Sequence, residues 1–399
     1  MKTHRHLAAV ALACLAVGAI SFAAAASPPE PAGAVNTRGT EVFRWDLEQK
    51  ATGFRQMERL FPANTTAAAQ TPRPLPDGAP MAAFEAGGAL AAELEEFMAS
   101  EYVAGLLVLH GGAVRLERYG LGLSPAGRWT SFSVAKSFTS TLVGAAIRDG
   151  YIGSLEDDIT DYIKDLRGSA YEGVTIRQLM TMTSGVAFNE DYNDPNSDIM
   201  RLYGDPPLTE MDATVAFVRE LEREAEPGAL WRYKTPETNL AGVLVMEATG
   251  RSLSGYLAEK IWQPYGMELD ATWLVDHIGN EQGGCCLQVG LRDYARFAQF
   301  ILEGGQVDGE PVLPEGWLEL ATTSQADTGF PGGYGFQWWP LDDGTFQARG
   351  IFGQLIHLDP ARELVVVISA AWPGPHEQQR RLAQIQFARQ IAAAIDAER

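Results

Sequence analysis

Ser133 and Lys136 lie three residues apart, and their types and spacing could do chemistry. The apolar positions that follow predict the start of a helix, in which a three-residue step places hydroxyl and amine on one face. An isolated serine hydroxyl is a weak nucleophile, and an adjacent base that takes its proton activates it for acyl transfer. The pair therefore predicts a serine hydrolase, although S-x-x-K by itself is a weak motif that also arises by chance.

Lys136 can serve as the base only in its neutral form. The positive end of a helix dipole and partial burial both disfavour the ammonium form. We therefore expect the pKa of Lys136 to be lowered towards about 7 to 8, where a general base works near neutral pH.

Two other segments carry groups suited to the same reaction. Tyr233 follows a Pro-Gly turn and precedes a predicted helix, so its side chain could reach a cleft and relay a proton. A packed surface aromatic is the alternative. Gly350 and Gly353 would let a substrate approach the backbone, where a main-chain N–H and that of Ser133 could face a developing oxyanion. A bulged edge strand is the alternative there.

Hydrophobic periodicity predicts the elements that must position these groups. An amphipathic helix at 90–98 leads into two alternating segments, which predict a β-hairpin over 102–119. Residues 131–302 have mostly helical periodicity, with helices expected at 137–148, 175–182, 212–222, 237–249 and 253–262. An antiparallel meander is expected from segments 335–339, 345–348, 354–358 and 364–368, followed by a helix at 377–394.

Strands at both ends with helices between them predict an α+β fold. One lobe, from about 84–130 and 303–399, would hold an antiparallel sheet flanked by helices. An inserted all-helical lobe would span about 131–302, and a cleft between the lobes would hold a substrate. Residues 27–83 are rich in Pro, Ala and Thr and are interpreted as a partly ordered lead-in with one helical patch near 54–60.

Residues 1–26 have the features of a signal peptide: Lys2 and Arg5, an apolar core, and small residues before a cleavage site after Ala26. We expect a periplasmic or secreted protein with no stable membrane span after cleavage. A lipoprotein attached through Cys14 is a weaker alternative, because no leucine stands three residues before it. Cys285 and Cys286 would remain; adjacent cysteines rarely pair, so packing is their expected role.

Charge and histidine spacing exclude several classes of function. A net charge of −20 argues against nucleic acid as a partner. The six histidines have no spacing suited to zinc, and we expect no metal and no cofactor. A Ser-His-Asp esterase is disfavoured because no G-x-S-x-G elbow is present, and His357 is interpreted as structural or surface-exposed. A non-catalytic binding protein with the same fold is a separate alternative.

Five motifs occur in the order found in penicillin-recognising serine hydrolases. They are residues 133–138, 174–186, the segment around Tyr233, 334–339 and 350–354. From about residue 84 to the C-terminus the chain resembles the class C β-lactamase superfamily, and within it the aminohexanoate-dimer (nylon-oligomer) hydrolase and esterase branch. The resemblance implies a β-lactamase/transpeptidase-like fold and an acyl-enzyme that water cleaves.

The resemblance also implies roles for individual residues. Ser133 would be the acylated nucleophile, Lys136 its base and Tyr233 the proton relay. The main-chain amides of Ser133 and Ile351 would form the oxyanion hole, so the Ile351 side chain would have no part in that role.

Tyr192, Gly350 and Trp338 are the substrate-binding residues that the matched motifs imply. Two departures bear on the substrate: Thr235 stands where β-lactamases have Asn, and Ala-Arg-Gly replaces Lys-Thr-Gly or His-Thr-Gly before the oxyanion position. Arg349 should point away from the face used by its strand neighbour, so it replaces the lost group poorly. We expect an ester or linear amide substrate, with β-lactamase or D-alanyl-D-alanine carboxypeptidase activity as the alternative.

Four acidic residues surround Tyr192 in the sequence: Glu190, Asp191, Asp194 and Asp198. An acidic rim would favour a substrate that carries an amine. A solvated acidic loop is the alternative in a chain this acidic.

Overall fold

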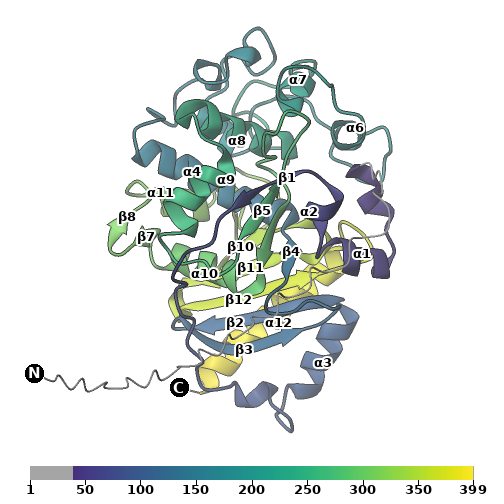
Figure 1. Ribbon diagram of the computed structural model, residues 1–399, viewed down its shortest axis with the longest axis vertical. Helices are drawn as coiled ribbons and strands as arrows, with labels where there is room; N and C mark the ends of the chain where they lie inside the picture. The colour runs from purple at the N-terminus through teal and green to yellow at the C-terminus, as the bar shows by residue number, and fades with distance from the viewer. Residues whose placement is uncertain (1–38, 399) are drawn as a thin grey trace, which may run out of the picture. The chain divides into compact units, whose positions relative to one another are not determined.

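The computed structural model describes residues 39–398 (Figure 1). The predicted signal peptide, the cleavage site after Ala26 and Cys14 lie outside the described residues, so export stays a prediction. Between Gly39 and Glu398, no helix is both long enough and apolar enough to span a bilayer.

A six-stranded antiparallel sheet combines strands from residues 103–119 and 339–370, in the order β3-β2-β12-β11-β10-β9. Its strands are β2 Val103–His110, β3 Ala113–Tyr119, β9 Trp339–Pro340, β10 Phe346–Arg349, β11 Leu355–Asp359 and β12 Leu364–Ala370. The hairpin predicted over 102–119 is confirmed, since β2 and β3 pair antiparallel. The predicted strand at 335–339 is wrong except at its end, because Gln337 has φ +64° and interrupts extended backbone.

Both faces of this sheet are covered by helices, which is why its central strands are buried along their length. Side chains alternate between the faces: Leu106 and Val108 belong to one core cluster, and Leu107 and Leu109 to the other. Helices α3 Ala91–Ser100 and α12 Gln378–Ala397 cover the first face, and α10 Leu291–Leu302 packs on the second (Figure 1).

Helices α4 Ala135–Arg148 and α8 Thr235–Thr249 are the central pair of the helical part and pack against each other. Both are buried nearly all round, as expected of helices inside a large core. The helices predicted at 137–148 and 237–249 are therefore confirmed. Helix α8 begins two residues earlier than predicted, with Pro236 in its first turn, where proline is tolerated.

The remaining helices are shorter. They are α5 Ile176–Met180, α6 Asp198–Gly204, α7 Ala213–Val218, α9 Leu253–Leu257 and α11 Trp317–Thr322, with η2 Ala82–Phe84, η3 Phe132–Val134, η4 Ile159–Asp161, η5 Lys164–Leu166, η6 Ala258–Trp262, η7 Ile351–Gly353 and η8 Pro360–Arg362. The helix expected at 253–262 is divided, because α9 passes into the π-helical turn η6. A small hairpin joins β7 Gln306–Val307 to β8 Glu310–Pro311.

A second, four-stranded sheet was not predicted. Its order is β1-β5-β6-β4, from β1 Ala63–Thr66, β5 Ala271–Leu274, β6 Leu287–Gly290 and β4 Arg128–Thr130. Strands β5 and β6 lie within 131–302 and are four residues long and fully buried. Periodicity cannot distinguish such short apolar runs from buried helix.

The segment from Gly39 to Thr66 is an integral part of the fold. It forms η1 Gly39–Arg44, α1 Leu47–Gly53 and α2 Met57–Leu60 before β1, which pairs with β5. Asp46 and Gln49 form a capping box at the start of α1. Lys50 of α1 is buried and donates to the carbonyl of Trp372 at 3.0 Å, so this segment is joined to the far end of the chain.

Candidate active site

Ser133 and Lys136 meet at the start of α4. Ser133 lies in the short turn η3, and Lys136 in the first turn of α4, where its side chain is 1% exposed. The Lys136 amine lies 3.2 Å from Ser133 Oγ, 3.1 Å from Thr235 Oγ1 and 2.7 Å from the carbonyl oxygen of Gly284. The predicted serine–amine contact is therefore present.

Burial lowers the pKa of Lys136 to about 8, because an ammonium ion is poorly solvated there. The Glu190 carboxylate acts in the opposite direction and raises this pKa. A substantial fraction of the amine is therefore neutral near pH 8, in the range that a general base requires.

Tyr233 is the third group at this position. Its ring centroid lies 5.3 Å from the Lys136 amine, and its interaction with Ser133 lowers its pKa against the larger effect of burial. The ring stacks on Trp339 with centroids 5.7 Å apart. Burial raises the pKa of Tyr233 well above its usual range, so its phenol stays protonated and can donate a hydrogen bond or a proton.

The turn after β10 comes close to Ser133, since Ile351 and Ser133 line the same cavity. Gly350 makes this possible, because a Cβ at this residue would lie 2.6 Å from the carbonyl oxygen of Ser131. Arg381 donates to the Gly350 carbonyl at 2.8 Å, and a trans peptide directs the N–H of Ile351 the opposite way. Outside the hydrogen bonds internal to helices and strands, no main-chain bond from this N–H or from that of Ser133 is found within residues 39–398. The two N–H groups are therefore candidates for binding an oxyanion.

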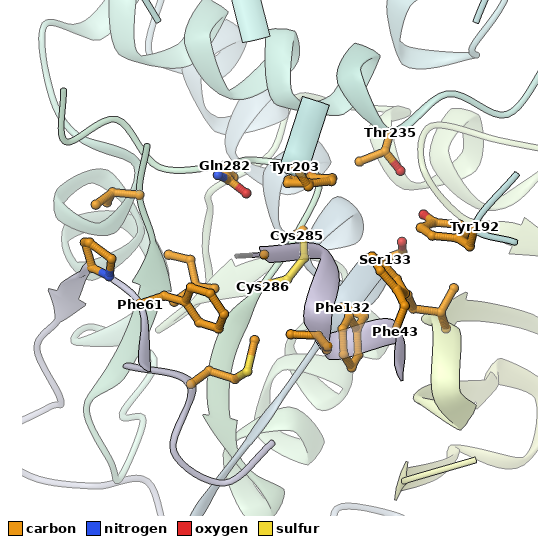
Figure 2. A pocket seen from close by; sticks show the side chains of 17 residues that line it. Phe43, Phe61, Phe132, Ser133, Tyr192, Tyr203, Thr235, Gln282, Cys285 and Cys286 are labelled. Atoms are coloured by element: carbon orange, nitrogen blue, oxygen red, sulfur yellow. A yellow bond between two sulfur atoms is a disulfide. The ribbon is translucent and has the colours of Figure 1, made fainter. Parts of the chain in front are cut away.

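A cavity of about 170 Å³ opens beside Ser133 (Figure 2). Ser133 and Tyr192 lie at one end of the view in Figure 2 and Phe61 at the other, with Cys285 between them. The lining is largely apolar and consists of Gly39, Val42, Phe43, Met57, Phe61, Pro62, Phe132, Ser133, Tyr192, Tyr203, Thr235, Leu274, Val275, Gln282, Cys285, Cys286 and Ile351. A mostly apolar lining with a few polar groups is typical of small-molecule sites.

The contribution of the N-terminal segment to this cavity was missed from the sequence. Phe43, Met57 and Phe61 line it, and the Phe43 ring lies 5.0 Å from that of Tyr192. The available signal was the group of large apolar residues within a Pro- and Ala-rich stretch, of which only 54–60 was interpreted as structured.

Trp338 does not reach the site. It is 1% exposed and packs in the core against Phe297 and Phe346, with centroids 6.4 and 5.4 Å away. Its neighbour Trp339 contacts Tyr233 instead, because successive side chains point to opposite sides of extended backbone. The Arg349 guanidinium lies 5.1 Å from the centre of the Trp339 ring.

The acidic residues around Tyr192 divide into two groups. Asp191, Asp194 and Asp198 accept main-chain N–H groups of their own loop, at 2.8, 2.9 and 2.8 Å. Glu190 instead accepts the Tyr192 hydroxyl at 2.8 Å and lies against Thr235. The three aspartates thus have a structural role as turn caps.

Cys285 and Cys286 form a disulfide, so the expectation that they do not pair is wrong. Cys286 has φ +119°, a backbone conformation that is uncommon for residues other than glycine. His357 is buried and hydrogen-bonded to Gln347 at 3.0 Å, and burial lowers its pKa to about 4. It is therefore structural, as predicted.

Comparison with known proteins assigns the family. The Beta-lactamase family matches residues 90–390, which is more than half of the chain. The chain belongs to the beta-lactamase family. This beta-lactamase-family chain is 30% identical over 366 residues to the 6-aminohexanoate-dimer hydrolase of Paenarthrobacter ureafaciens, covering 86% of this chain and 91% of the relative. The resemblance inferred from the five motifs is thus confirmed, and the protein is a hydrolase of this family.

Solved structures confirm the β-lactamase/transpeptidase-like fold of this beta-lactamase-family hydrolase. A Bacillus anthracis protein proposed to be a 6-aminohexanoate-dimer hydrolase superposes with a TM-score of 0.76 at 23% identity, covering 90% of this chain and 97% of that one. A D-stereospecific amidohydrolase from Streptomyces sp. superposes with a TM-score of 0.57 at 20% identity, covering 73% and 97%.

Proposed function

We propose that the protein cleaves esters or linear amides through an acyl-enzyme formed on Ser133. The observation that carries the proposal is the buried amine of Lys136, 3.2 Å from Ser133 Oγ, with its pKa lowered to about 8. Nucleophile and base within hydrogen-bond reach are the signature of covalent acyl transfer.

Each group has one step in this reaction. Lys136 takes the Ser133 proton as the oxygen attacks the substrate carbonyl, and the N–H groups of Ser133 and Ile351 stabilise the oxyanion. Tyr233 gives its phenolic proton to the leaving group and takes the former serine proton from Lys136, so that the leaving group departs neutral from the acyl-enzyme and both Tyr233 and the amine return to their starting forms. Water then attacks the ester by the reverse sequence, with the Ser133 oxygen as leaving group.

The cavity supports a substrate with an apolar portion. Phe43, Phe61 and Phe132 contribute rings to its wall, whereas the aspartates of the neighbouring loop are held by main-chain donors. A linear amide is also supported by the relative named a 6-aminohexanoate-dimer hydrolase. β-Lactam hydrolysis is the second candidate, because other relatives are named beta-lactamases, over 42% of this chain in one case.

Two measurements test the proposal. Purified protein should be labelled by a fluorophosphonate probe at Ser133, as shown by peptide mass spectrometry. A panel of short-chain esters, linear amides, nitrocefin and D-alanyl peptides should then give its highest kcat/KM with an ester or linear amide. No labelling would contradict the acyl-enzyme, and a preference for nitrocefin or D-alanyl peptides would contradict the substrate class.

Arg381→Met is expected to lower kcat by roughly 10-fold with little change in KM. The substitution removes the hydrogen bond to the Gly350 carbonyl, so the Gly350–Ile351 peptide is no longer held and the proposed N–H bond to the oxyanion weakens in the transition state. Steady-state kinetics on the best ester measures both constants. Arg381→Lys should recover part of kcat, since it keeps a donor for the Gly350 carbonyl. Arg389→Met is the matched control on the same helix: Arg389 pairs with Asp343 at 3.0 Å on the surface. An equal loss in both Met variants would contradict the role of Arg381.

A further inference from the structure

The Lys136 amine can take the Ser133 proton only if its lone pair points at the serine oxygen. Three oxygen atoms surround the amine, from Gly284, Thr235 and Ser133. A neutral amine has two N–H donors and one lone pair. It is a base towards Ser133 only when the other two oxygens accept its hydrogens, so that the lone pair faces the serine.

The Gly284 carbonyl oxygen always accepts a hydrogen from the amine, because a carbonyl oxygen can only accept. The Thr235 hydroxyl can either accept a hydrogen from the amine or donate its own hydrogen to it. If the Thr235 hydroxyl donated to Lys136, it would occupy the lone pair and leave no base for Ser133. Another group must therefore take the Thr235 hydrogen.

Glu190 is that group. One of its oxygens accepts the Thr235 hydroxyl and also the Tyr192 hydroxyl at 2.8 Å, and the other accepts the main-chain N–H of Thr235. All three groups that contact Glu190 donate a hydrogen bond to it, which suits an ionised carboxylate, because its oxygens can only accept. In Figure 2, Thr235 and Tyr192 lie on the side of the cavity where Ser133 is found.

We propose that Glu190 is a positioning residue, which acts through the Thr235 hydroxyl to keep the lone pair of Lys136 directed at Ser133. The inference rests on the proposed function, because it concerns the base of that reaction. When Lys136 takes the Ser133 proton it becomes an ammonium with three N–H groups. Gly284, Thr235 and the Ser133 oxygen then each accept one, and the new positive charge faces the Glu190 carboxylate.

Glu190 and Lys136 act on each other electrostatically. Burial raises the pKa of Glu190, whereas the Lys136 charge and the hydrogen bonds from Thr235 and Tyr192 lower it and favour the carboxylate. Among the described residues, Glu190 is the charged group that shifts the pKa of Lys136, and it raises it against the effect of burial. Tyr192, Tyr203 and Tyr233 also face this region, and burial raises the pKa of each, so they remain neutral. Loss of the Glu190 charge should therefore lower the pKa of Lys136.

The test measures the rate of fluorophosphonate acylation from pH 5.5 to 10, which requires no knowledge of the natural substrate. The unchanged protein should show a rise with a midpoint near pH 8, the pKa of Lys136. Glu190→Gln should lower the plateau rate roughly 10-fold, because its amide can donate to Thr235 and reverse the hydroxyl. It should also move the midpoint about one pH unit lower.

Two variants at the bridging residue complete the test. Thr235→Val removes the hydroxyl and should lower the plateau roughly 10-fold or more, whereas Thr235→Ser keeps it and should stay within about 3-fold of the unchanged protein. Asp191→Asn is the matched control: it removes a carboxylate from the next position of the loop, where Asp191 accepts the main-chain N–H and the side-chain amide of Asn193. It should leave plateau and midpoint unchanged.

A Glu190→Gln plateau equal to that of the unchanged protein would overturn the proposal, whatever its midpoint. An equal loss of the plateau rate in Asp191→Asn would also overturn it, because the loss would then follow from any change in the loop and not from the Glu190 carboxylate. Circular dichroism checks that each variant is folded; if Thr235→Val is not, Glu190→Gln and Thr235→Ser decide. Failure of the proposed function is a different result: the unchanged protein is then not acylated, or shows no rise near pH 8.

Discussion

Ser133→Ala is expected to abolish fluorophosphonate labelling and to reduce hydrolysis at least about 10⁴-fold, as loss of a covalent nucleophile does. Without the hydroxyl no acyl-enzyme forms, although the cavity, the oxyanion N–H groups and Lys136 remain. Labelling by gel fluorescence and kcat on the best ester measure the effect. The variant should stay folded, because the Ser133 side chain contacts only groups of the site itself.

Ser140→Ala is the matched control for this prediction. Ser140 lies on α4, the helix that follows Ser133, is also buried, and donates to the Phe336 carbonyl at 2.8 Å. Its loss should lower the free energy of unfolding by about 1 kcal/mol, the net value of a typical hydrogen bond, and leave labelling intact. Undiminished labelling of Ser133→Ala, or equal loss in Ser140→Ala, would contradict the assignment of the nucleophile.

Lys136→Met has the second largest expected effect, a fall in kcat/KM of about 10² to 10⁴-fold, the usual contribution of a general base. Its pH dependence is diagnostic. In the unchanged protein the rate should rise with pH through about 8, because the base is the neutral amine and burial lowers its pKa to about 8. The residual activity of Lys136→Met should lack this rise.

Lys260→Met controls for the loss of a lysine. Lys260 is half-buried and pairs with Asp149 at 2.9 Å. It should keep both the rate and the rise with pH. A Lys136→Met variant with full activity, or with the rise preserved, would show that another group takes the Ser133 proton.

Local sequence patterns were sufficient for several elements. Helices α4 and α8 lie in long stretches rich in apolar residues, and the β2–β3 hairpin has strand-forming residues on both sides of a glycine pair. The starts of both helices were predicted two residues too late. Each of these patterns lies within one contiguous stretch. The prediction therefore required no knowledge of what the element packs against.

Elements defined by distant partners were not predictable in this way. Strands β5 and β6 are four residues long and exist because β1 and β4, from far earlier in the chain, pair with them. The segment at 39–61 was interpreted as a lead-in, since its role depends on a cavity that other segments complete. Trp338 and Trp339 share a motif, and only the path of the backbone decides which of them meets Tyr233.

The sequence by itself determined which groups are available for chemistry. A serine and a lysine one helical turn apart, a tyrosine before α8 and glycines after β10 were evident from spacing, which is a local property of the chain. The tertiary structure decided whether the amine can be a base. Its low pKa comes from burial, and its orientation from Gly284, Thr235 and Glu190, which lie between 54 and 148 residues away in sequence. Solvation and hydrogen-bond direction depend on all the residues packed around the amine. The spacing of residues in the sequence does not contain that information.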